Sequence, residues 1–537
     1  MAGSESAPPS LGPIFIPTAI DQILACVDTA GFRSLRAVDV AWHVLISGEH
    51  PRKAGDTSEC LAGHRRQSWR ERVWDFGRDG LPQTSSGGAA AAAGQPRRVS
   101  AASGAIISVH LGGHGVAVAE AAWPLYRDSQ GLSKQESMYY LADTRPGERL
   151  VPRAVLVDCG EGAPDHLLRG PCRHLFHPAA AVRAQGSSAH AQGEEDGCDA
   201  EAAGKVAELT LERCRVFAEG SDCLQGFMAM YAADGGRASA VAECLLCTDT
   251  FQDFFGKGRV CVVPRVAGGD GPSLKASILA ALHARRSEAD AAIMFSELRL
   301  SAVGASLRSQ GLLPDSPALP LEAAVVGRWL DLFTHRWRTS TSRSLDQDLD
   351  DSGIMWHPAL KFIMPSLAVH PLGLGPDYPV SKLVQTLYTP SGSLLDADAA
   401  FASAQRPTNC CYLSTSVFMR AGAEATGPAF QRACWEQRMS LNFAGFVDAE
   451  VPAELQMHQP SSEGPAARNI AAWAIAASNH TSFGAQLEAR LNNLKSLPGS
   501  KARLTESEYG ECLALVRDYD TVVADLDLSS ALGAPWC

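Results

Sequence analysis

The stretch that decides the fold reads IISVHLGGHG and runs from Ile106 to Gly115. Its first six residues are mostly apolar and predict a short buried strand. The glycines that follow permit positive φ angles and a close approach of the backbone to a ligand. Residues 116–126 then show the spacing of a helix. The stretch therefore predicts the first strand, turn and helix of an α/β unit.

The same order recurs further along the chain. Residues 154–158 read as a second buried strand, residues 207–218 as a helix, and residues 224–231 as a third strand that runs into a glycine turn at 234–236. Repeated units of this kind predict an α/β fold with a doubly wound parallel sheet and helices on both faces. Ligands of such sheets lie outside the carboxyl ends of the strands. A nucleotide or phosphate site at that edge is therefore the first functional hypothesis.

Composition restricts the class of protein. The chain has 537 residues, 46% apolar and 20% charged, which is enough for several domains with large cores. Its net charge of −12 argues against a general nucleic-acid binder. No apolar run reaches the roughly 18 residues of a membrane span, and the start of the chain lacks a signal-peptide pattern. The 15 cysteines are typical of reduced thiols. We expect a soluble, cytoplasmic protein with neither DNA nor membrane as a partner.

Residues 1–103 differ from the rest of the chain and predict an N-terminal extension that ends in a linker. A basic and aromatic patch lies at 64–74, and a run rich in serine, glycine and alanine at 85–96 has the composition of a linker. The patch could bind RNA or an acidic tail through arginine and aromatic side chains. The pattern favours a solvated helix face anchored by tryptophans.

Two glycine-rich turns are candidates for a phosphate site. The turn at 112–115 matches neither the Walker loop nor the full dinucleotide fingerprint, and most such turns bind nothing. The turn at 234–240, which reads DGGRASA, lies between a strand and an alanine-rich helix and could hold a phosphate in a nest of amides. Taken alone, these patterns favour turns without a ligand.

Several blocks of the sequence, in order, resemble the tubulin family and are nearest to α-tubulin. The blocks are 106–116 with 122–126, 151–158, 173–178, 224–227, 478–481 with 487–491, and 509–525. The resemblance covers roughly residues 105–526. It implies a GTP-binding domain at 104–328, an intermediate α+β sandwich domain at 329–468, and a C-terminal helical region at 469–537. It also implies head-to-tail assembly, a contact that forms filaments when the rotation does not close.

The resemblance assigns candidate nucleotide ligands to positions of this chain. They are Gly112, Gly113, Gly115, Asp158, Glu161, Gly235, Gly236, Arg237 and Ser239. Gly113 stands where the family has a glutamine, and Gly160 where it has an acid, so Glu161 is the candidate ligand for Mg²⁺. Asp234 places a carboxylate near the expected triphosphate, at a cost of about 1–4 kcal/mol, and Arg237 could offset it by pairing with a phosphate. Glu297, Ala318 and Glu322 fall near the places of the guanine-reading residues, so selectivity for guanine is not predicted.

The acidic segment 345–351 resembles the hydrolytic loop of α-tubulin. In that family the last acid positions water against the nucleotide of the neighbouring subunit. Asp351 occupies that place with a side chain one methylene shorter, and Asp348 matches a second acid. A carboxylate can act on water only within hydrogen-bond reach. The alternative, an acidic solvated loop without a catalytic role, stays open.

The resemblance leads to two functional hypotheses. In the first, the chain is a divergent GTP-binding tubulin that joins a specialised microtubule array with a β-like partner, and the GTPase is completed across the subunit interface. In the second, it is a nucleotide-free scaffold or assembly factor with a tubulin fold. The segment 497–505 is short and the end at 529–537 lacks an acidic tail, which argues against a bulk microtubule subunit. Both hypotheses predict a cytoplasmic, cytoskeletal protein.

Overall fold

The computed structural model describes most of the chain beyond residue 103. The described residues are 104–128, 138–142, 149–160, 162–183, 200–221, 223–246, 251, 255, 259–266, 271–286, 289–313, 319–339, 345, 349, 360–371, 374, 378–395, 411–422, 425–441, 443, 453–457, 471–497 and 504–531. The predicted N-terminal extension, with its basic and aromatic patch, lies outside them.

Strands and helices alternate through the first part of the described chain. The strands are β1 (Ala105–Leu111), β2 (Tyr139–Ala142), β3 (Arg149–Pro152), β4 (Ala154–Val157), β5 (Ala181–Val182), β6 (Leu224–Ala233), β7 (Arg259–Val266), β8 (Ala291–Ile293), β9 (Phe295–Ser296), β10 (Phe362–His370), β11 (Tyr412–Ala421), β12 (Ala453–Met457) and β13 (Ala472–His480). The helices are α5 (Gly112–Asp128), α6 (Ala163–Arg169), α7 (Ala200–Glu219), α8 (Arg237–Leu246), α10 (Gly271–Arg286), α11 (Glu297–Ser309), α12 (Leu321–Phe333), α13 (His335–Thr339), α15 (Val380–Thr386), α17 (Gly427–Ser440), α18 (Ser482–Ser496) and α19 (Glu506–Ala531).

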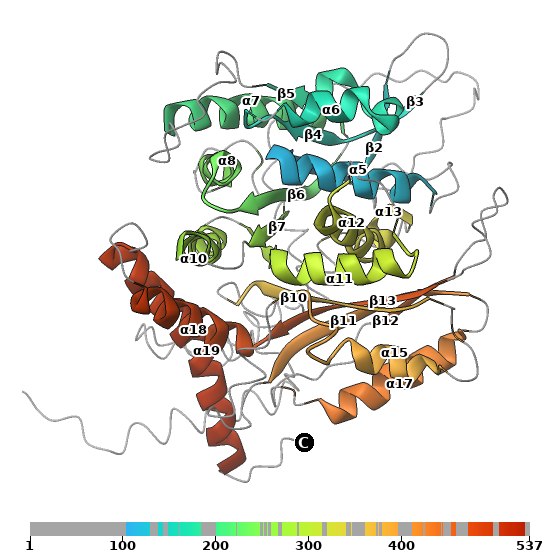
Figure 1. Cartoon of the computed structure of the whole chain (residues 1–537), viewed down its shortest axis with the longest axis vertical. Coiled ribbons are helices and arrows are strands. Elements are labelled where there is room, and N and C mark those ends of the chain that lie inside the picture. The colour runs from blue at the N-terminus through green and yellow to red at the C-terminus, as the bar shows by residue number, and fades with distance from the viewer. Residues whose placement is uncertain are drawn as a thin grey trace, which may run out of the picture. The chain divides into compact units, whose positions relative to one another are not determined.

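One long sheet runs through the molecule in the order β12-β11-β13-β10-β8-β7-β6-β1-β4-β5, and β9 pairs with β7 (Figure 1). β1 lies between β4 and β6 and is parallel to both, with Val109 opposite Val155 on one side and Ala229 on the other. The predicted parallel α/β sheet is therefore confirmed. Beyond β8 the sheet becomes mixed, because β13 is antiparallel to both β10 and β11.

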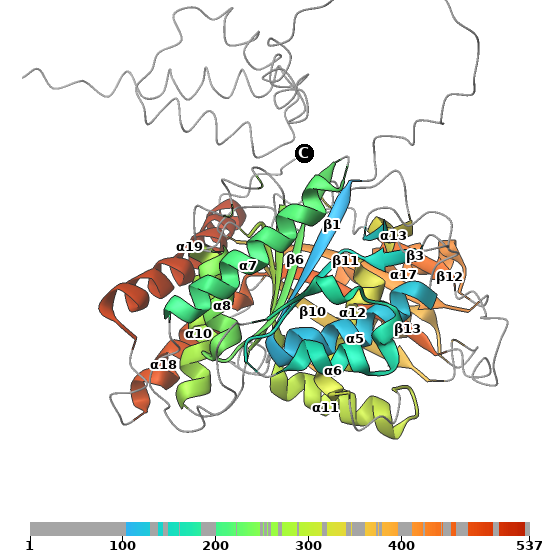
Figure 2. The same ribbon diagram turned by 90° about the horizontal axis from the view of Figure 1, so that it is seen from above.

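Alternate residues of β1 enter two different hydrophobic cores, as the two-residue period of a strand requires. Ile107 and Val109 pack in the core that takes side chains from α7, α8, α10, α18 and α19, whereas Ile106 packs in the core of α5, α6, α11 and α12. Figure 2 shows α7, α8 and α10 along one face of the strands and α5, α6 and α11 along the other. This arrangement explains why β1 reads as a continuous apolar run.

The two C-terminal helices pack against each other and against α10. Gly484 of α18 lies against Tyr519 of α19, where an added Cβ would come within 2.7 Å of the Tyr519 Cβ. Arg285 of α10 donates to Asp518 at 2.9 Å, which ties α10 to α19. The helix predicted for 509–525 is confirmed, and it extends further at both ends as α19. Among the helices that the structure describes, none combines the length and the apolar character that a membrane span requires.

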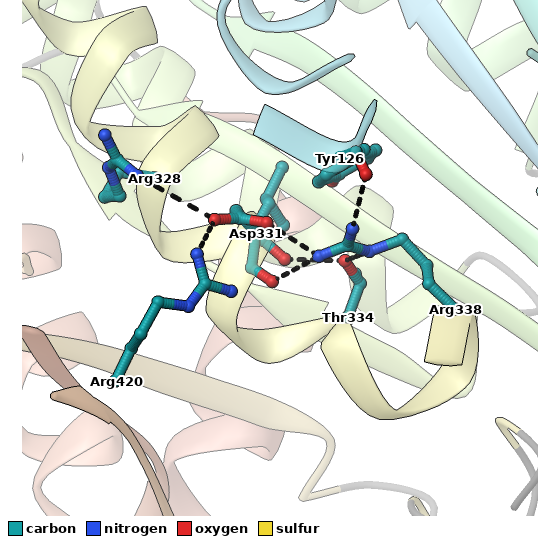
Figure 3. Close-up of polar contacts among 7 residues, drawn as sticks. Tyr126, Arg328, Asp331, Thr334, Arg338 and Arg420 are labelled. Carbon is teal, nitrogen blue, oxygen red and sulfur yellow. Dashed lines mark hydrogen bonds and ion pairs between the residues drawn. The ribbon is translucent and has the colours of Figure 1, made fainter. Parts of the chain in front are cut away.

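A buried ion-pair cluster joins α12 to the neighbouring elements (Figure 3). Asp331 of α12 is fully buried and accepts from Arg338 of α13 at 2.7 Å and from Arg420 of β11 at 2.5 Å, and Arg328 lies 3.9 Å away. The Arg338 guanidinium also lies 4.1 Å from the ring centre of Tyr126 in α5. Burial alone would raise the pKa of Asp331, but the guanidiniums, Arg420 first, outweigh it and hold that pKa at about 2. The cluster therefore fixes α5, α12, α13 and β11 to one another.

Candidate nucleotide-binding edge

The carboxyl ends of β1, β4 and β6 meet at one edge of the parallel sheet, so the loops that follow them lie together. α5 begins at Gly112 directly after β1, and α8 begins at Arg237 shortly after β6. Two helix N-termini, which carry partial positive charge, therefore start at the same edge. Most of the candidate nucleotide ligands that were predicted from the sequence lie at this edge.

The first loop depends on glycines for its backbone path. Gly112 has φ +66°, a left-handed conformation that favours glycine, and an added Cβ there would come within 2.9 Å of the Ala238 Cβ. A Cβ at Gly115 would lie 2.5 Å from the carbonyl oxygen of Met230 in β6. Gly115 therefore lets α5 pack directly on the sheet. Gly113, the remaining candidate in this loop, lies in the first turn of α5 and is partly exposed.

The second loop, after β4, is shaped by Asp158. Its Oδ1 accepts hydrogen bonds from the backbone N–H groups of Gly160 and Gly162, each at 2.9 Å. Both glycines have positive φ angles, +105° and +68°. The predicted ligand Asp158 thus holds its own loop together. The predicted metal ligand Glu161 lies outside the described residues and remains a prediction.

The third loop closes through its own side chains. The N–H of Gly235, which has φ +80°, donates to the Ser239 hydroxyl at 3.1 Å, and that hydroxyl donates to the Ala232 carbonyl at 2.9 Å. The N–H of Gly236 donates to Oδ1 of Asp234 at 2.9 Å. Two amides that could face a phosphate therefore already have acceptors within the loop.

Arg237 connects the third loop to the second. Its guanidinium lies against Gly160, because an added Cβ at Gly160 would overlap Nη1 and lie 3.5 Å from Cζ. The side chain of Arg237 is exposed, so its guanidinium can be reached from solvent at the edge. The two loops therefore meet through an arginine and a glycine without a Cβ.

Two residues of the edge were not found from the sequence. Arg265, the penultimate residue of β7, has its Nη1 3.5 Å from Oε1 of Glu297, and its buried Nε has no hydrogen-bond partner in the described part of the chain. His114 lies in the first turn of α5, and burial together with the nearby Arg265 lowers the pKa of His114 to about 3. His114 is therefore neutral near pH 7. The available signal for Arg265 was its position at the carboxyl end of a strand.

The positions expected near a base do not form a guanine-reading set. Glu297 faces Arg265, and the carboxylate of Glu322 accepts from the Ser301 hydroxyl. Ala318 lies outside the described residues. A carboxylate that is already paired recognises a base edge less well than a free amide side chain, because its partner must first be displaced.

The edge fits the phosphate part of a nucleotide better than the base. Left-handed backbone at Gly112 and Gly235, two helix N-termini and the guanidiniums of Arg237 and Arg265 all suit an anion. Asp234 opposes it, since its carboxylate already accepts the Gly236 amide. A phosphate at the third loop would have to displace that contact.

The predicted hydrolytic loop is described only at its two leucines. Leu345 and Leu349 are both buried, and the N–H of Leu345 donates to Oε1 of Gln225 in β6 at 2.9 Å. These contacts anchor the segment to the core. Asp348 and Asp351 lie outside the described residues, so their catalytic roles remain predictions.

No family model matches the chain. The α-tubulin of Dictyostelium discoideum is 26% identical over 165 residues, which are 26% of this chain and 34% of that protein. The nucleomorph α-tubulin of Guillardia theta is 27% identical over 161 residues, again 26% and 34% of the two chains. The α-1B tubulin of Physarum polycephalum is 23% identical over 320 residues, 55% of this chain and 68% of that protein.

The chain therefore spans about a third of the length of two of these relatives and about two thirds of the third. A mostly parallel sheet covered by helices on both faces, with glycine loops at its carboxyl edge, defines a doubly wound α/β fold. The low-identity similarity to α-tubulins agrees with this architecture and supports a divergent tubulin-like fold.

Proposed function

We propose that this chain is a tubulin-like subunit of the microtubule cytoskeleton in the cytoplasm, which contacts a β-like tubulin partner head to tail and holds GTP at the carboxyl edge of its sheet. The observation that supports nucleotide binding is the meeting of three loops at that edge, with left-handed glycines at Gly112 and Gly235. The α-tubulin relatives support the cytoskeletal role.

The residues of this chain would divide the work at the edge. Gly112, Gly113 and Gly115 keep the first loop free of bulky side chains, and Ser239 braces the third loop from inside. Arg237 supplies positive charge to the phosphates. In this proposal Asp351, supported by Asp348, orients water against the nucleotide of the next subunit, so the GTPase belongs to the interface between subunits.

Co-assembly with tubulin tests the cytoskeletal part of the proposal. Purified full-length chain is mixed with αβ-tubulin and GTP, and polymer is collected by sedimentation. We expect the chain to pellet with the polymer in a saturable manner. The variant Asp351→Asn should pellet equally but slow phosphate release, whereas the matched control Asp350→Asn should change neither. A chain that stays in the supernatant at all tubulin concentrations contradicts the proposal.

A second candidate function is that of a nucleotide-free scaffold with a tubulin fold. The contact of Asp234 with the Gly236 amide favours it, because a carboxylate already stands where a phosphate oxygen would accept. The variant Asp234→Gly separates the two candidates. If the scaffold hypothesis holds, GTP binds only to the variant. If the first proposal holds, the wild-type chain binds GTP and the variant binds it more tightly.

A further inference from the structure

The C-terminal ends of three helical segments lie together and carry a group of basic side chains. The segments are α5, α6 and η2, a 3₁₀-helix from Pro171 to His174. α6 packs beside α5 (Figures 1 and 2), and Gly170 alone separates α6 from η2. The basic surface consists of the basic residues in these last turns, all of them exposed, which are Arg127, His166, Arg169, Arg173 and His174.

A pair of hydrogen bonds joins the end of α5 to η2. Nη1 of Arg127 donates to Nε2 of His174 at 2.6 Å, because an arginine can only donate, and Nδ1 of His174 donates to the Pro171 carbonyl at 3.0 Å. An imidazole that accepts at one nitrogen and donates at the other is neutral. The permanent positive charge of the basic surface therefore comes from its arginines.

Few acidic groups of the described residues offset this charge. Asp165 of α6 pairs with Arg183 at 2.6 Å, and the hydrogen bond from Arg183 lowers the pKa of Asp165. Glu120 of α5 is partly buried, and that burial raises its pKa. Arg169 and Arg173 are exposed, and neither forms an ion pair within the described part of the chain. The surface therefore presents positive charge to solvent, on a chain whose net charge is −12.

Helix dipoles explain only part of this arrangement. A basic residue in the last turn of a helix is stabilised by the carbonyl groups that end the helix. α6 and η2 each place two basic residues there. The same carbonyl groups offer no N–H donors to a phosphate, unlike a helix N-terminus. An anion at this surface must therefore be held by side chains, and the planar guanidinium matches a carboxylate in a two-point contact.

We propose that the basic surface binds an acidic segment of a partner protein, in which several aspartate or glutamate side chains follow one another. The basic side chains come from three separate helix ends, so a flexible chain that crosses them contacts more of them than a single small anion could. Nucleic acid fits less well, because the net charge of −12 repels a long polyanion beyond the surface. The inference goes beyond the proposed function and does not depend on the nucleotide site.

Fluorescence anisotropy of a labelled oligoglutamate peptide, titrated with the full chain at low salt and without nucleotide, tests the inference. We expect saturable binding that weakens as salt is added, because salt screens exposed charges. The double variant Arg169→Gln with Arg173→Gln should raise the Kd about tenfold, since it removes two charge-assisted contacts. The matched control Arg432→Gln, at an exposed position of α17, should leave the Kd unchanged.

Three outcomes would overturn the inference. The first is a wild-type chain that does not bind the peptide at low salt. The second is binding that the double variant leaves unchanged, because the peptide would then lie elsewhere on the chain. The third is an oligothymidylate that binds more tightly than the peptide and loses its binding in the same variant, which would assign the surface to nucleic acid. Near-ultraviolet circular dichroism of each variant shows whether it has kept its fold, and none of these results bears on GTP binding.

Discussion

Replacing Asp331 by asparagine removes the buried carboxylate that the arginines of the cluster contact, and it keeps the shape of the side chain. Asp331 is 0% exposed, and Arg338, Arg420 and Arg328 all lie within 4 Å of it. The fall in its pKa from 3.8 to about 2 corresponds to roughly 2 kcal/mol in favour of the charged form in the folded protein. The variant also removes the negative charge of Asp331 from beside these guanidiniums. We therefore expect Asp331→Asn to lower the free energy of unfolding by about 3–5 kcal/mol.

Urea unfolding followed by tryptophan fluorescence measures this loss. The matched control is Asp165→Asn, which breaks a 2.6 Å ion pair with Arg183 at the surface, where both side chains are more than 40% exposed. We expect the control to lose at most about 1 kcal/mol, because exposed pairs contribute little. Equal losses in the two variants would refute the reasoning that burial makes the Asp331 cluster costly to break.

The cluster also predicts the sign of a pH effect. Because the pKa of Asp331 is lowered in the folded state, its contribution is fully present above the unfolded value of about 3.8 and is lost as the pH falls towards about 2. The difference in stability between wild type and Asp331→Asn should therefore shrink over that interval. A difference that stays constant would contradict the assigned charge.

Three further predictions follow from individual contacts. Gly115→Ala should lower the free energy of unfolding in urea by about 1–3 kcal/mol, because its methyl group would lie 2.5 Å from a carbonyl oxygen of β6. The control Gly204→Ala, in open space on α7, should be neutral or stabilising. Equal effects of the two substitutions would contradict the packing role of Gly115. Gly484→Ala should push α19 away at Tyr519 and speed hydrogen exchange in α19, and unchanged exchange would argue against that contact. Burial lowers the pKa of His110 from 6.5 to about 3, so between these pH values this histidine takes up a proton only in the unfolded chain. The stability of the protein therefore falls as the pH decreases from 6.5 towards 3. His110→Gln should flatten the pH dependence of the urea midpoint.

The local pattern of apolar residues was sufficient to predict the parallel part of the sheet. Residues 106–111 were predicted as a buried strand because a central parallel strand is covered on both faces, and β1 confirms it. The helix after it was predicted from 116, but α5 begins at Gly112. Glycine has low helix propensity, so the local pattern did not predict this early start. The early start places Gly115 where α5 packs closely on β6.

Contacts between distant segments could not be predicted from the same patterns. Asp331 and Arg420 are 89 residues apart and meet only after α12 and β11 have packed. The internal closure of the third loop by Asp234 depends on side-chain rotamers that its composition does not specify. Arg265 reads in the sequence as an ordinary strand residue, and only the arrangement of the sheet brings it beside His114. The glycines of the candidate site could therefore be predicted from the sequence, whereas the contacts between its loops could not.

The nucleotide content of the purified, folded chain tests the central claim most directly. The protein is extracted with acid at known concentration, and the extract is separated by chromatography. The account predicts guanine nucleotide in near-stoichiometric amount, held at the edge that includes Gly112, Gly235 and Arg237. An extract without nucleotide, from a chain that also fails to take up millimolar GTP, would contradict it and leave the tubulin-like fold as a scaffold.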